Sequence, residues 1–287
     1  MRESWPAMRI FGRFIFQGSR FYGEVCGEDV RFLIQPYWQS LEFSGETRSL
    51  GEMTIDVPVT PSKVIAVGLN YSDHIKEMQR TEIGSPLIWF KAPSSLLPHE
   101  GTIEIAFPEH KTDFETELAI VIGKPAKNVS ADYAADFIFG YTIGEDISDR
   151  DLQKSEKQFS RCKSFDTYTP VGPFVYQNVD VTDLEISLQQ NGETRQHART
   201  SQMIYSPAEI VAFASRSLTL LPGDLILTGT PSGVGPLGAG DELVATIGDW
   251  PPLRNRVANV SSDQKKLALA QFNGLSTSAV KAHPNES

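Results

Sequence analysis

Two glutamates, Glu115 and Glu117, combine a residue type and a spacing that suggest chemistry. They begin the run from Asp113 to Gly123, whose alternation is typical of a β-strand, so both side chains are expected on one face, roughly 7 Å apart. Like charges that close repel unless a proton or a cation lies between them. With Asp146, at the end of a second strand-like run, they form a candidate set of metal ligands. Carboxylates without a Cys or His pair favour Mg²⁺, with Mn²⁺ or Ca²⁺ as alternatives, although a lone Glu-x-Glu is more often a solvated strand edge.

A histidine and a third glutamate offer a general base. An apolar strand is predicted over residues 63–68, and the helix after it, capped by Asn70 or Ser72, would hold His74 and Glu77 on one face. A carboxylate beside a histidine orients the ring and makes it more basic, as a base for water or an acidic C–H requires. The alternative is an exposed His–Glu pair, the more common case for this spacing alone.

More polar residues follow Asp146 along the chain. Ser148 is expected to cap a short helix that carries Arg150 and Gln153 on one side of its first turn. Lys163 opens a polar, turn-rich stretch that suits a binding loop. Taken singly, however, a lysine in such a stretch is more often a surface residue.

The glycine-rich stretch from Gly229 to Gly235 resembles a phosphate loop only in its glycine content. It lacks the Gly-Lys-Ser/Thr ending, and no dinucleotide-binding pattern follows, which argues against nucleotide binding. Glycines let the backbone approach a ligand closely. Gly229, Thr230 and their neighbours are therefore expected to form a backbone-lined wall for a small molecule.

The patterns between these residues indicate a chain made mainly of strands. Asn191-Gly192, between two polar and apolar runs, predicts a β-hairpin. Ser206-Pro207-Ala208-Glu209 combines a capping box with proline at the first helical position and predicts a helix from about Pro207 to Ser217. Pro222-Gly223-Asp224 is expected to turn the chain into another strand. The fold class that follows is α+β, mainly β.

The domain organisation is expected to have three parts. Short β-favouring runs indicate a small N-terminal β-domain over residues 1–58, with the polar stretch 44–52 at its boundary. A larger catalytic domain would cover 59–257. The composition of 258–287 is typical of an appended tail, within which residues 264–272 favour a helix.

Composition narrows the class of protein and its partners. The 287 residues carry 26 Lys+Arg against 36 Asp+Glu, a net charge of −10, which argues against nucleic acid or an anionic membrane as the main partner. The two cysteines, Cys26 and Cys162, form no metal spacing and no disulfide framework, so a reducing cytoplasm is the expected compartment. Neither a transmembrane run nor a signal-peptide pattern is evident.

Taken together, these pieces resemble the fumarylacetoacetate hydrolase family over about residues 63–257. Any single motif is weak, but their order and spacing agree. The matching landmarks are Gly68-Leu69-Asn70-Tyr71-x-x-His74-x-x-Glu77, Glu115-x-Glu117, Gly140-Tyr141-Thr142 leading to Asp146-Ile147-Ser148-x-Arg150-Asp151-Leu152-Gln153, Lys163-Ser164-Phe165-Asp166-Thr167, Pro222-Gly223-Asp224, and Thr228-Gly229-Thr230-Pro231-Ser232-Gly233-Val234-Gly235.

The resemblance implies a mixed β-roll or sandwich catalytic domain with flanking helices, preceded by the small β-domain and paired into a homodimer. It also implies that Glu115, Glu117 and Asp146 hold Mg²⁺ or Mn²⁺ and that the substrate is a small 2-oxo acid. A divalent ion with open positions can chelate the 2-oxo group and its carboxylate and stabilise an enolate. Lys163 would then bind the substrate carboxylate or a developing oxyanion, with Arg150 and Gln153 orienting the substrate.

Three functions follow as hypotheses. The first is a divalent-metal-dependent hydrolase that cleaves a C–C bond in an acylpyruvate or related β-diketo acid, with water activated by His74 and Glu77. The second is a 2-hydroxy-dienedioate isomerase or decarboxylase, or an oxaloacetate decarboxylase, on the same scaffold. The third is a non-catalytic, metal-stabilised binding protein. Retention of both the base and Lys163 argues against the third.

Three positions depart from the common family pattern. Glu145 stands where asparagine is frequent, and Asp149 where a small residue is frequent. Extra acidity beside the metal ligands can alter metal tuning or substrate choice. Cys162 stands where glycine is frequent and is expected to be structural, because no histidine lies near it in the sequence.

Overall fold

The computed structural model describes residues 7–79 and 84–260. Strands dominate these ranges, which confirms the expected mainly β, α+β class. No helix within the two ranges is long and apolar enough to cross a membrane. The helix predicted over 264–272 lies outside the described residues.

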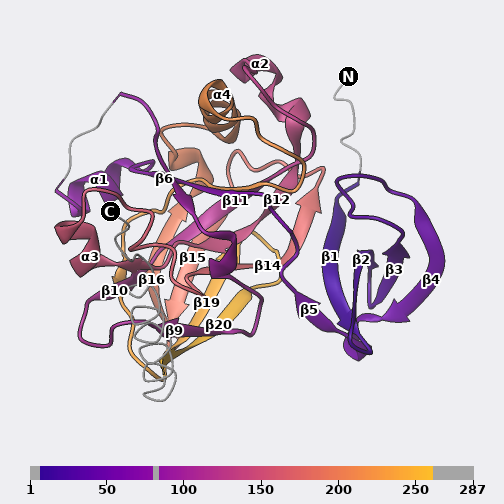
Figure 1. Cartoon of the computed structure of the whole chain (residues 1–287), viewed down its shortest axis with the longest axis horizontal. Coiled ribbons are helices and arrows are strands. Elements are labelled where there is room, and N and C mark those ends of the chain that lie inside the picture. Colours follow the sequence, from indigo (N-terminus) through magenta and orange to yellow (C-terminus); the bar gives the residue numbers. More distant parts are fainter. Residues whose placement is uncertain (1–6, 80–83, 261–287) are drawn as a thin grey trace, which may run out of the picture.

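The larger of the two main sheets has twelve strands, which come from parts of the chain between β1 and β17 (Figure 1). Ten strands follow in the order β4, β3, β2, β1, β14, β12, β11, β17, β6 and β7, while β5 pairs with β1 and β8 with β14. Their bounds are β1 Arg9–Phe16, β2 Ser19–Cys26, β3 Asp29–Leu33, β4 Phe43–Ser49, β5 Thr54–Asp56, β6 Val64–Gly68, β7 Leu87–Lys91, β8 Leu96–Leu97, β11 Thr116–Ile122, β12 Ile138–Glu145, β14 Thr169–Gln177 and β17 Leu225–Leu227.

The N-terminal strands form one end of this sheet, seen in indigo in Figure 1. Strand β1 pairs with β2 on one side and with β14 on the other, so the N-terminal β-structure is bonded directly to the sheet of the larger part. The polar stretch 44–52, expected at the domain boundary, forms most of β4 and a 3₁₀ turn. It can do so because an edge strand needs a partner on one side only, here β3, and its exposed faces tolerate polar residues.

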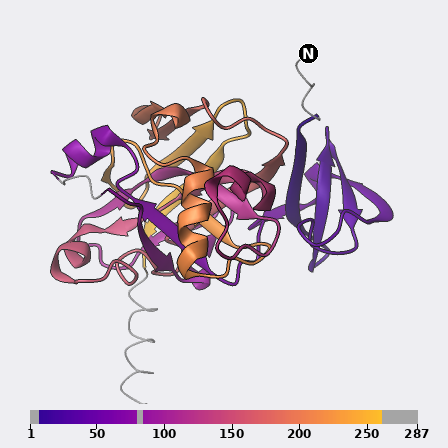
Figure 2. The ribbon, with the colours of Figure 1, turned by 90° about the horizontal axis from the view of Figure 1, so that it is seen from above.

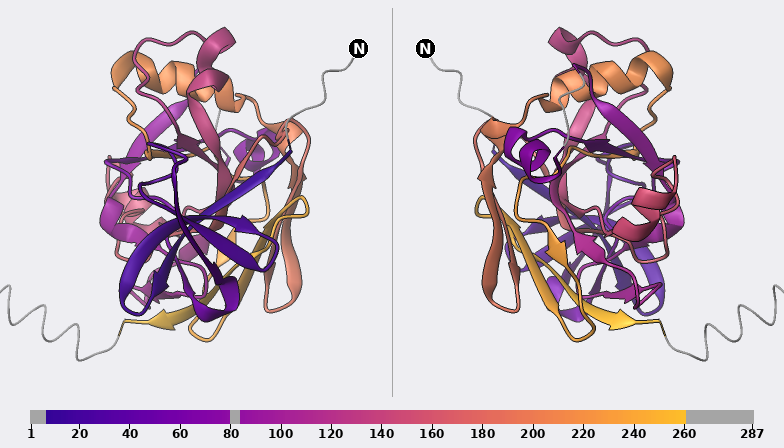
Figure 3. Two further views of the ribbon diagram at one scale, coloured as in Figure 1. Left: turned by 90° about the vertical axis from the view of Figure 1, so that its right-hand side faces the viewer. Right: turned by 90° about the vertical axis from the view of Figure 1, so that its left-hand side faces the viewer.

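A second sheet of five strands packs against the first (Figure 3). Its order is β16, β15, β19, β20 and β9, with bounds β9 Thr102–Ile105, β15 Glu185–Gln190, β16 Glu193–Arg199, β19 Glu242–Ile247 and β20 Leu253–Asn259. The predicted hairpin at Asn191-Gly192 joins β15 to β16, and both turn residues have positive φ. A core between the sheets includes Leu118 and Ile143 from the first and Leu188 from the second. Strand β20 extends two residues beyond Val257.

Helices cover part of the large sheet (Figure 2). Helix α4 (Pro207–Ser217) has the predicted bounds and the predicted capping box. It packs beside α2 (Ala131–Ala134) and buries Ile210, Val211 and Ala214 against apolar residues of β6, β11 and β17. The other helices are α1 (Ser72–Glu77) and α3 (Arg150–Ser155), with 3₁₀ turns η1 Leu50–Glu52, η2 Pro93–Ser95, η3 Ala135–Phe137 and η4 Thr200–Gln202.

The run expected as one strand from Asp113 to Gly123 is divided at Glu115. Before it, β10 (Thr112–Phe114) joins a three-stranded sheet with β13 (Ser148–Asp149) and β18 (Gly235–Pro236). After it, β11 enters the large sheet between β12 and β17. The Glu115 carbonyl accepts from the Asp146 N–H (2.9 Å) at the point where the two sheets diverge. The break therefore puts Glu115 at a junction beside Asp146.

Candidate active site

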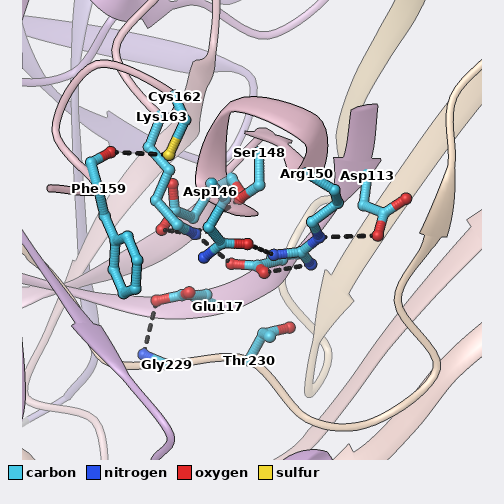
Figure 4. Close-up of polar contacts among 12 residues, drawn as sticks. Asp113, Glu117, Asp146, Ser148, Arg150, Phe159, Cys162, Lys163, Gly229 and Thr230 are labelled. Atoms are coloured by element: carbon cyan, nitrogen blue, oxygen red, sulfur yellow. Dashed lines mark hydrogen bonds and ion pairs between the residues drawn. The ribbon is translucent and has the colours of Figure 1, made fainter. Parts of the chain in front are cut away.

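Three carboxylates meet where β11 and β12 lie side by side (Figure 4). One oxygen each from Glu115, Glu117 and Asp146 lies within 4.8 Å of the other two, and all three residues are buried. The register explains the meeting, since Glu117 pairs with Gly144, two residues before Asp146. The convergence that the alternating pattern predicts is thus present.

Three basic side chains bind this cluster: Lys163, Arg150 and Lys91. The Lys163 ammonium donates to Glu115 (2.9 Å), Asp146 (2.8 Å) and the Ser148 hydroxyl (2.6 Å). Arg150 donates to Glu115 (2.5 Å) and, through Nε, to Asp113 (2.8 Å). Lys163 is therefore a buried ion-pair partner, whereas a lysine of that stretch taken singly is more often exposed.

Lys91 is a buried site residue that the sequence analysis missed. Its ammonium donates to Asp146 Oδ1 (2.5 Å), to the Tyr168 carbonyl (3.0 Å) and to the Lys163 carbonyl. Burial lowers its pKa, while the charge of Asp146 opposes that shift. A signal was available, because alternation along β7 puts Lys91 on the same face as Trp89.

The charges divide the carboxylates into two kinds. Burial opposes ionisation of Glu115, yet the neighbouring Lys163 and Arg150 hold its pKa well below the usual range. Within the described residues no Lys or Arg forms an ion pair with Glu117. Its Oε2 accepts a hydrogen bond from the Gly229 N–H (2.6 Å). Burial, with the charges of Asp146 and Glu115, raises the pKa of Glu117 well above its usual value.

This donor set fits a divalent cation. Three carboxylates supply hard oxygen donors at one point, and Glu117 faces two like charges that a cation would offset. Glu115, Glu117 and Asp146 are accordingly the residues that would hold the ion. The identity of the ion, expected as Mg²⁺, stays a prediction.

His74 and Glu77 also come together as their spacing predicts. Both lie on α1, and His74 Nδ1 is 3.0 Å from Glu77 Oε2. The other carboxylate oxygen, Oε1, accepts from the Gly233 N–H (3.0 Å), so the glycine-rich loop fixes the glutamate. With Nδ1–H donating to Glu77, the neutral ring keeps Nε2 as its proton acceptor. His74 is buried and lines the same cavity as Glu115 and Glu117.

Gly229 and Thr230 lie across from the carboxylates (Figure 4). Gly229 has a φ of +98°, and a β-carbon there would come within 2.6 Å of Asn70 Cβ, so only glycine suits the position. The Thr230 hydroxyl donates to the Thr116 carbonyl (2.9 Å) and accepts from Gln196 (2.7 Å). These bonds hold the loop in place; Thr230 lines the cavity described below, whereas Gly229 is not among its lining residues.

Asn70 has a different role from the helix cap that the sequence suggests. The residue before α1 is Tyr71, and no side chain caps this helix. Instead the buried Asn70 amide donates to the carbonyls of Thr228 (2.7 Å) and Tyr205 (3.0 Å) and accepts from the Tyr205 N–H (2.7 Å). It ties the start of α1 to the strand that precedes the glycine-rich loop.

Removing this amide is expected to destabilise the fold. Asn70→Ala would leave two carbonyls and one N–H without their partner and should lower the free energy of unfolding by about 2–3 kcal/mol. Urea unfolding followed by circular dichroism measures it. Asn259→Ala is the control, because that residue is exposed at the end of β20 and does not have a positive φ. A loss below about 0.5 kcal/mol for Asn70→Ala would contradict the assigned bracing role.

These residues surround a cavity of about 470 Å³. The expected site residues His74, Glu115, Glu117, Arg150, Gln153, Lys163 and Thr230 all line it, and Arg150 donates to Gln153 (2.9 Å) from the same side of α3, as predicted. The remaining lining residues are Val67, Gly68, Leu69, Met78, Gln79, Leu87, Trp89 and Phe159. The cavity thus has charged and apolar portions.

The cap of α3 is Asp149, not Ser148. Asp149 Oδ1 accepts from the N–H groups of Asp151 (3.1 Å) and Leu152 (3.0 Å), while Ser148 is occupied with Lys163. An ionised carboxylate at a helix start also interacts favourably with the helix dipole. Asp149, one of the departures from the family pattern, therefore has a structural role.

His110 pairs with this cap and makes stability depend on pH. Its Nδ1 is 2.7 Å from Asp149 Oδ2, and this bond raises the pKa of His110 above its ordinary value. Because the pKa is higher in the folded state, the pair contributes its full stabilisation below the unfolded-state pKa, near 6.5. This contribution is lost as the pH rises through the folded-state pKa. The excess stability of wild type over His110→Gln should therefore be greater at pH 6 than at pH 9. Urea unfolding at both pH values measures it, and an equal difference would contradict the pairing.

The other two departures are buried. Burial raises the pKa of Glu145 to about 8, although the hydrogen bond that its carboxyl accepts from the Thr116 hydroxyl opposes this shift. Burial likewise raises the pKa of the Cys162 thiol to about 11. Because the thiolate is the nucleophilic form, Cys162 is suited to a structural role, as expected.

Comparison with known proteins assigns this architecture to a family. The model of the fumarylacetoacetate (FAA) hydrolase C-terminal domain matches residues 63–258. The chain belongs to this family of enzymes. The matched range contains every residue of the cavity described above.

Relatives of this chain are named for several different activities. A Mycobacterium tuberculosis protein is 44% identical over 82% of this chain and 90% of its own length, and a mitochondrial oxaloacetate tautomerase of Rattus norvegicus is 37% identical over 72% and 70%. The crystal structure of a 2-hydroxyhepta-2,4-diene-1,7-dioate isomerase from Mycobacterium marinum has a TM-score of 0.82, with 39% identity over 89% and 100%. Fumarylpyruvate hydrolase from Pseudomonas aeruginosa, in complex with Mn²⁺ and pyruvate, has a TM-score of 0.64, with 32% identity over 71% and 91%.

Proposed function

We propose that this protein is a divalent-metal-dependent hydrolase that cleaves a C–C bond in an acylpyruvate or related β-diketo acid. The observation that carries the proposal is the His74–Glu77 pair beside the carboxylate cluster in one cavity. An oriented histidine with a free Nε2 is what activation of water requires. The bond from Gly233 to Glu77 supports the pair, because it holds the carboxylate in place.

The carboxylate cluster would hold Mg²⁺ or Mn²⁺ through Glu115, Glu117 and Asp146. When bound, such an ion supplies positive charge that offsets the negative charge developing on the 2-oxo oxygen of the substrate. The Mn²⁺ and pyruvate bound to the Pseudomonas aeruginosa relative support this assignment. Lys163 adds a fixed positive charge beside the cluster, and Gln153 and Thr230 offer polar atoms that can orient the substrate.

The reaction follows from the base. His74 takes a proton from water, and the water oxygen attacks the carbonyl carbon of the acyl group. The bond between that carbon and the neighbouring CH₂ carbon breaks, and its electron pair passes to the pyruvate enolate. The imidazolium, stabilised by Glu77, returns the proton to the CH₂ carbon of the enolate, which becomes the methyl group of pyruvate. The products are pyruvate and one carboxylic acid, which accounts for every atom of substrate and water.

A second candidate uses the same residues without attack by water. Two relatives, an isomerase and an oxaloacetate tautomerase, favour proton transfer on a 2-hydroxy-dienedioate or an enol as the reaction, and decarboxylation of oxaloacetate belongs to the same group. His74 would then move a proton between two substrate atoms. Both candidates require the same charged end of the cavity.

Product analysis separates the candidates. The protein, reconstituted with Mg²⁺ or Mn²⁺, is incubated with acetylpyruvate, fumarylpyruvate, oxaloacetate and a 2-hydroxy-dienedioate, and products are identified by NMR. Pyruvate together with a second carboxylic acid from an acylpyruvate supports the hydrolase. Release of carbon dioxide, or only a shifted double bond, supports the second candidate and rejects the first.

A further inference from the structure

The cavity has an apolar end whose chemistry restricts the substrate. Six of its lining residues are apolar: Val67, Leu69, Met78, Leu87, Trp89 and Phe159. Val67 lies in β6 and Leu87 and Trp89 lie in β7. Leu69 and Met78 lie just before and just after α1, and Phe159 lies between α3 and β14, so separate elements of the fold build the apolar end. A substrate held by its 2-oxo acid group at the carboxylate cluster would direct its tail along these residues.

Trp89 occupies the junction between the two ends. Its ring lies over Gly68 on the neighbouring strand, where a β-carbon would come within 2.7 Å of it, so glycine leaves the space that the indole fills. Phe159 packs edge-to-face on the same indole, with ring centroids 5.5 Å apart. On the charged side, Lys163 Nζ lies 4.8 Å from the indole centroid. The ring is therefore fixed from three sides.

The cations that line the cavity are already bound to carboxylates. Arg150 pairs with Asp113 and Glu115, and Lys163 pairs with Glu115 and Asp146. Among the lining residues in the described ranges, no further Lys or Arg stands at the apolar end. Against these apolar side chains a second carboxylate on the tail would lose hydration, and the described lining residues offer it no Lys or Arg beyond the paired Arg150 and Lys163, which is unfavourable.

We propose that Trp89 and Phe159 form a selectivity wall that admits 2-oxo acids with an uncharged apolar or planar tail and disfavours those with a second carboxylate. This rests on the proposed function, because it assumes that the 2-oxo acid group binds at the carboxylate cluster. It goes further by choosing monocarboxylates over dioates. An acylpyruvate with an alkyl or aryl acyl group is the substrate class that follows.

The test compares ligands of equal chain length that the enzyme does not cleave. Binding of 2-oxohexanoate and 2-oxoadipate to the Mg²⁺-loaded protein is measured by calorimetry, with pyruvate as the ligand that lacks a tail. The expected Kd for 2-oxohexanoate is about tenfold or more below that for 2-oxoadipate. Equal or tighter binding of 2-oxoadipate would overturn the proposed selectivity of the wall, while leaving the proposed function intact. Failure of all three to bind would reject the proposed function itself.

Variants assign the preference to the wall. Trp89→Ala should reduce the preference at least about threefold, and Trp89→Phe should keep most of the preference because it retains an aromatic face. Phe90→Ala is the matched control, because Phe90 is adjacent on β7, 45% exposed and absent from the cavity lining. An unchanged preference in folded Trp89→Ala, or an equal loss in Phe90→Ala, would overturn the assignment.

Discussion

His74→Ala is expected to lower kcat for hydrolysis of an acylpyruvate by about 10²–10⁴-fold, the range typical for loss of a general base. The affinity for Mg²⁺ should stay close to wild type, because His74 is not among the clustered carboxylates. The large effect follows from geometry, since Glu77 fixes the ring through Nδ1 and leaves Nε2 to accept the proton. Steady-state kinetics gives kcat and KM, and calorimetry gives the metal affinity.

The control for this variant lies on the same helix. Asp73 is exposed and pairs with Lys76, and it is not among the described residues that line the cavity, so Asp73→Ala should keep kcat within about twofold. Oxaloacetate decarboxylation requires no attack by water, so His74→Ala should impair it far less than hydrolysis. Equal loss of both activities would contradict the water-activating role of His74.

Glu117→Gln and Glu115→Gln should change the stability of the chelator-treated protein in opposite directions. Glu117 is buried beside two like charges, so the neutral amide should raise the free energy of unfolding by about 1 kcal/mol or more. Glu115 is bound by Arg150 and Lys163, so removal of its charge should cost about 3 kcal/mol. Chemical denaturation in EDTA measures both.

Both variants should lose the stabilisation that a divalent ion gives to the wild type. An ion at 100 times its Kd adds about 2.7 kcal/mol to the free energy of unfolding. The melting temperature of wild type should therefore rise with Mg²⁺ or Mn²⁺, while that of either variant should remain nearly constant. Undiminished metal stabilisation in Glu117→Gln would show that Glu117 is not a ligand. Destabilisation of that variant in EDTA would contradict the charge balance described here.

Local patterns were enough to predict much of the architecture and the members of the site. The helix over Pro207–Ser217 was predicted with its bounds because its capping box lies in four consecutive residues. The hairpin at Asn191-Gly192 followed from a turn that requires positive φ at both positions. Strand alternation predicts that Glu115 and Glu117 share one face. Their carboxylates do lie together, although the chain breaks between β10 and β11 at Glu115.

Features that depend on distant partners could not be predicted in the same way. Burial of an ammonium requires a negative partner. Asp146 supplies it to both Lys91 and Lys163, and Glu115 also pairs with Lys163. Asp146 lies far along the chain from Lys91. Asn70 is a residue type that often caps helices, but here its side-chain amide donates to the carbonyls of Thr228 and Tyr205 instead. The edge strand β4 lacks an apolar pattern because nearly all of its residues are exposed. Its backbone pairing with β3 holds it in the sheet.

The most direct test of the central claim is a single turnover in ¹⁸O-enriched water. Excess Mg²⁺-loaded protein is mixed with acetylpyruvate or benzoylpyruvate, the reaction is stopped early, and the carboxylic acid and the unreacted substrate are analysed by mass spectrometry. If His74 activates water for attack on the acyl carbonyl, the released acid must carry one ¹⁸O beyond any label in the recovered substrate. Formation of no new acid, or of an acid without that additional label, would contradict a C–C bond hydrolase.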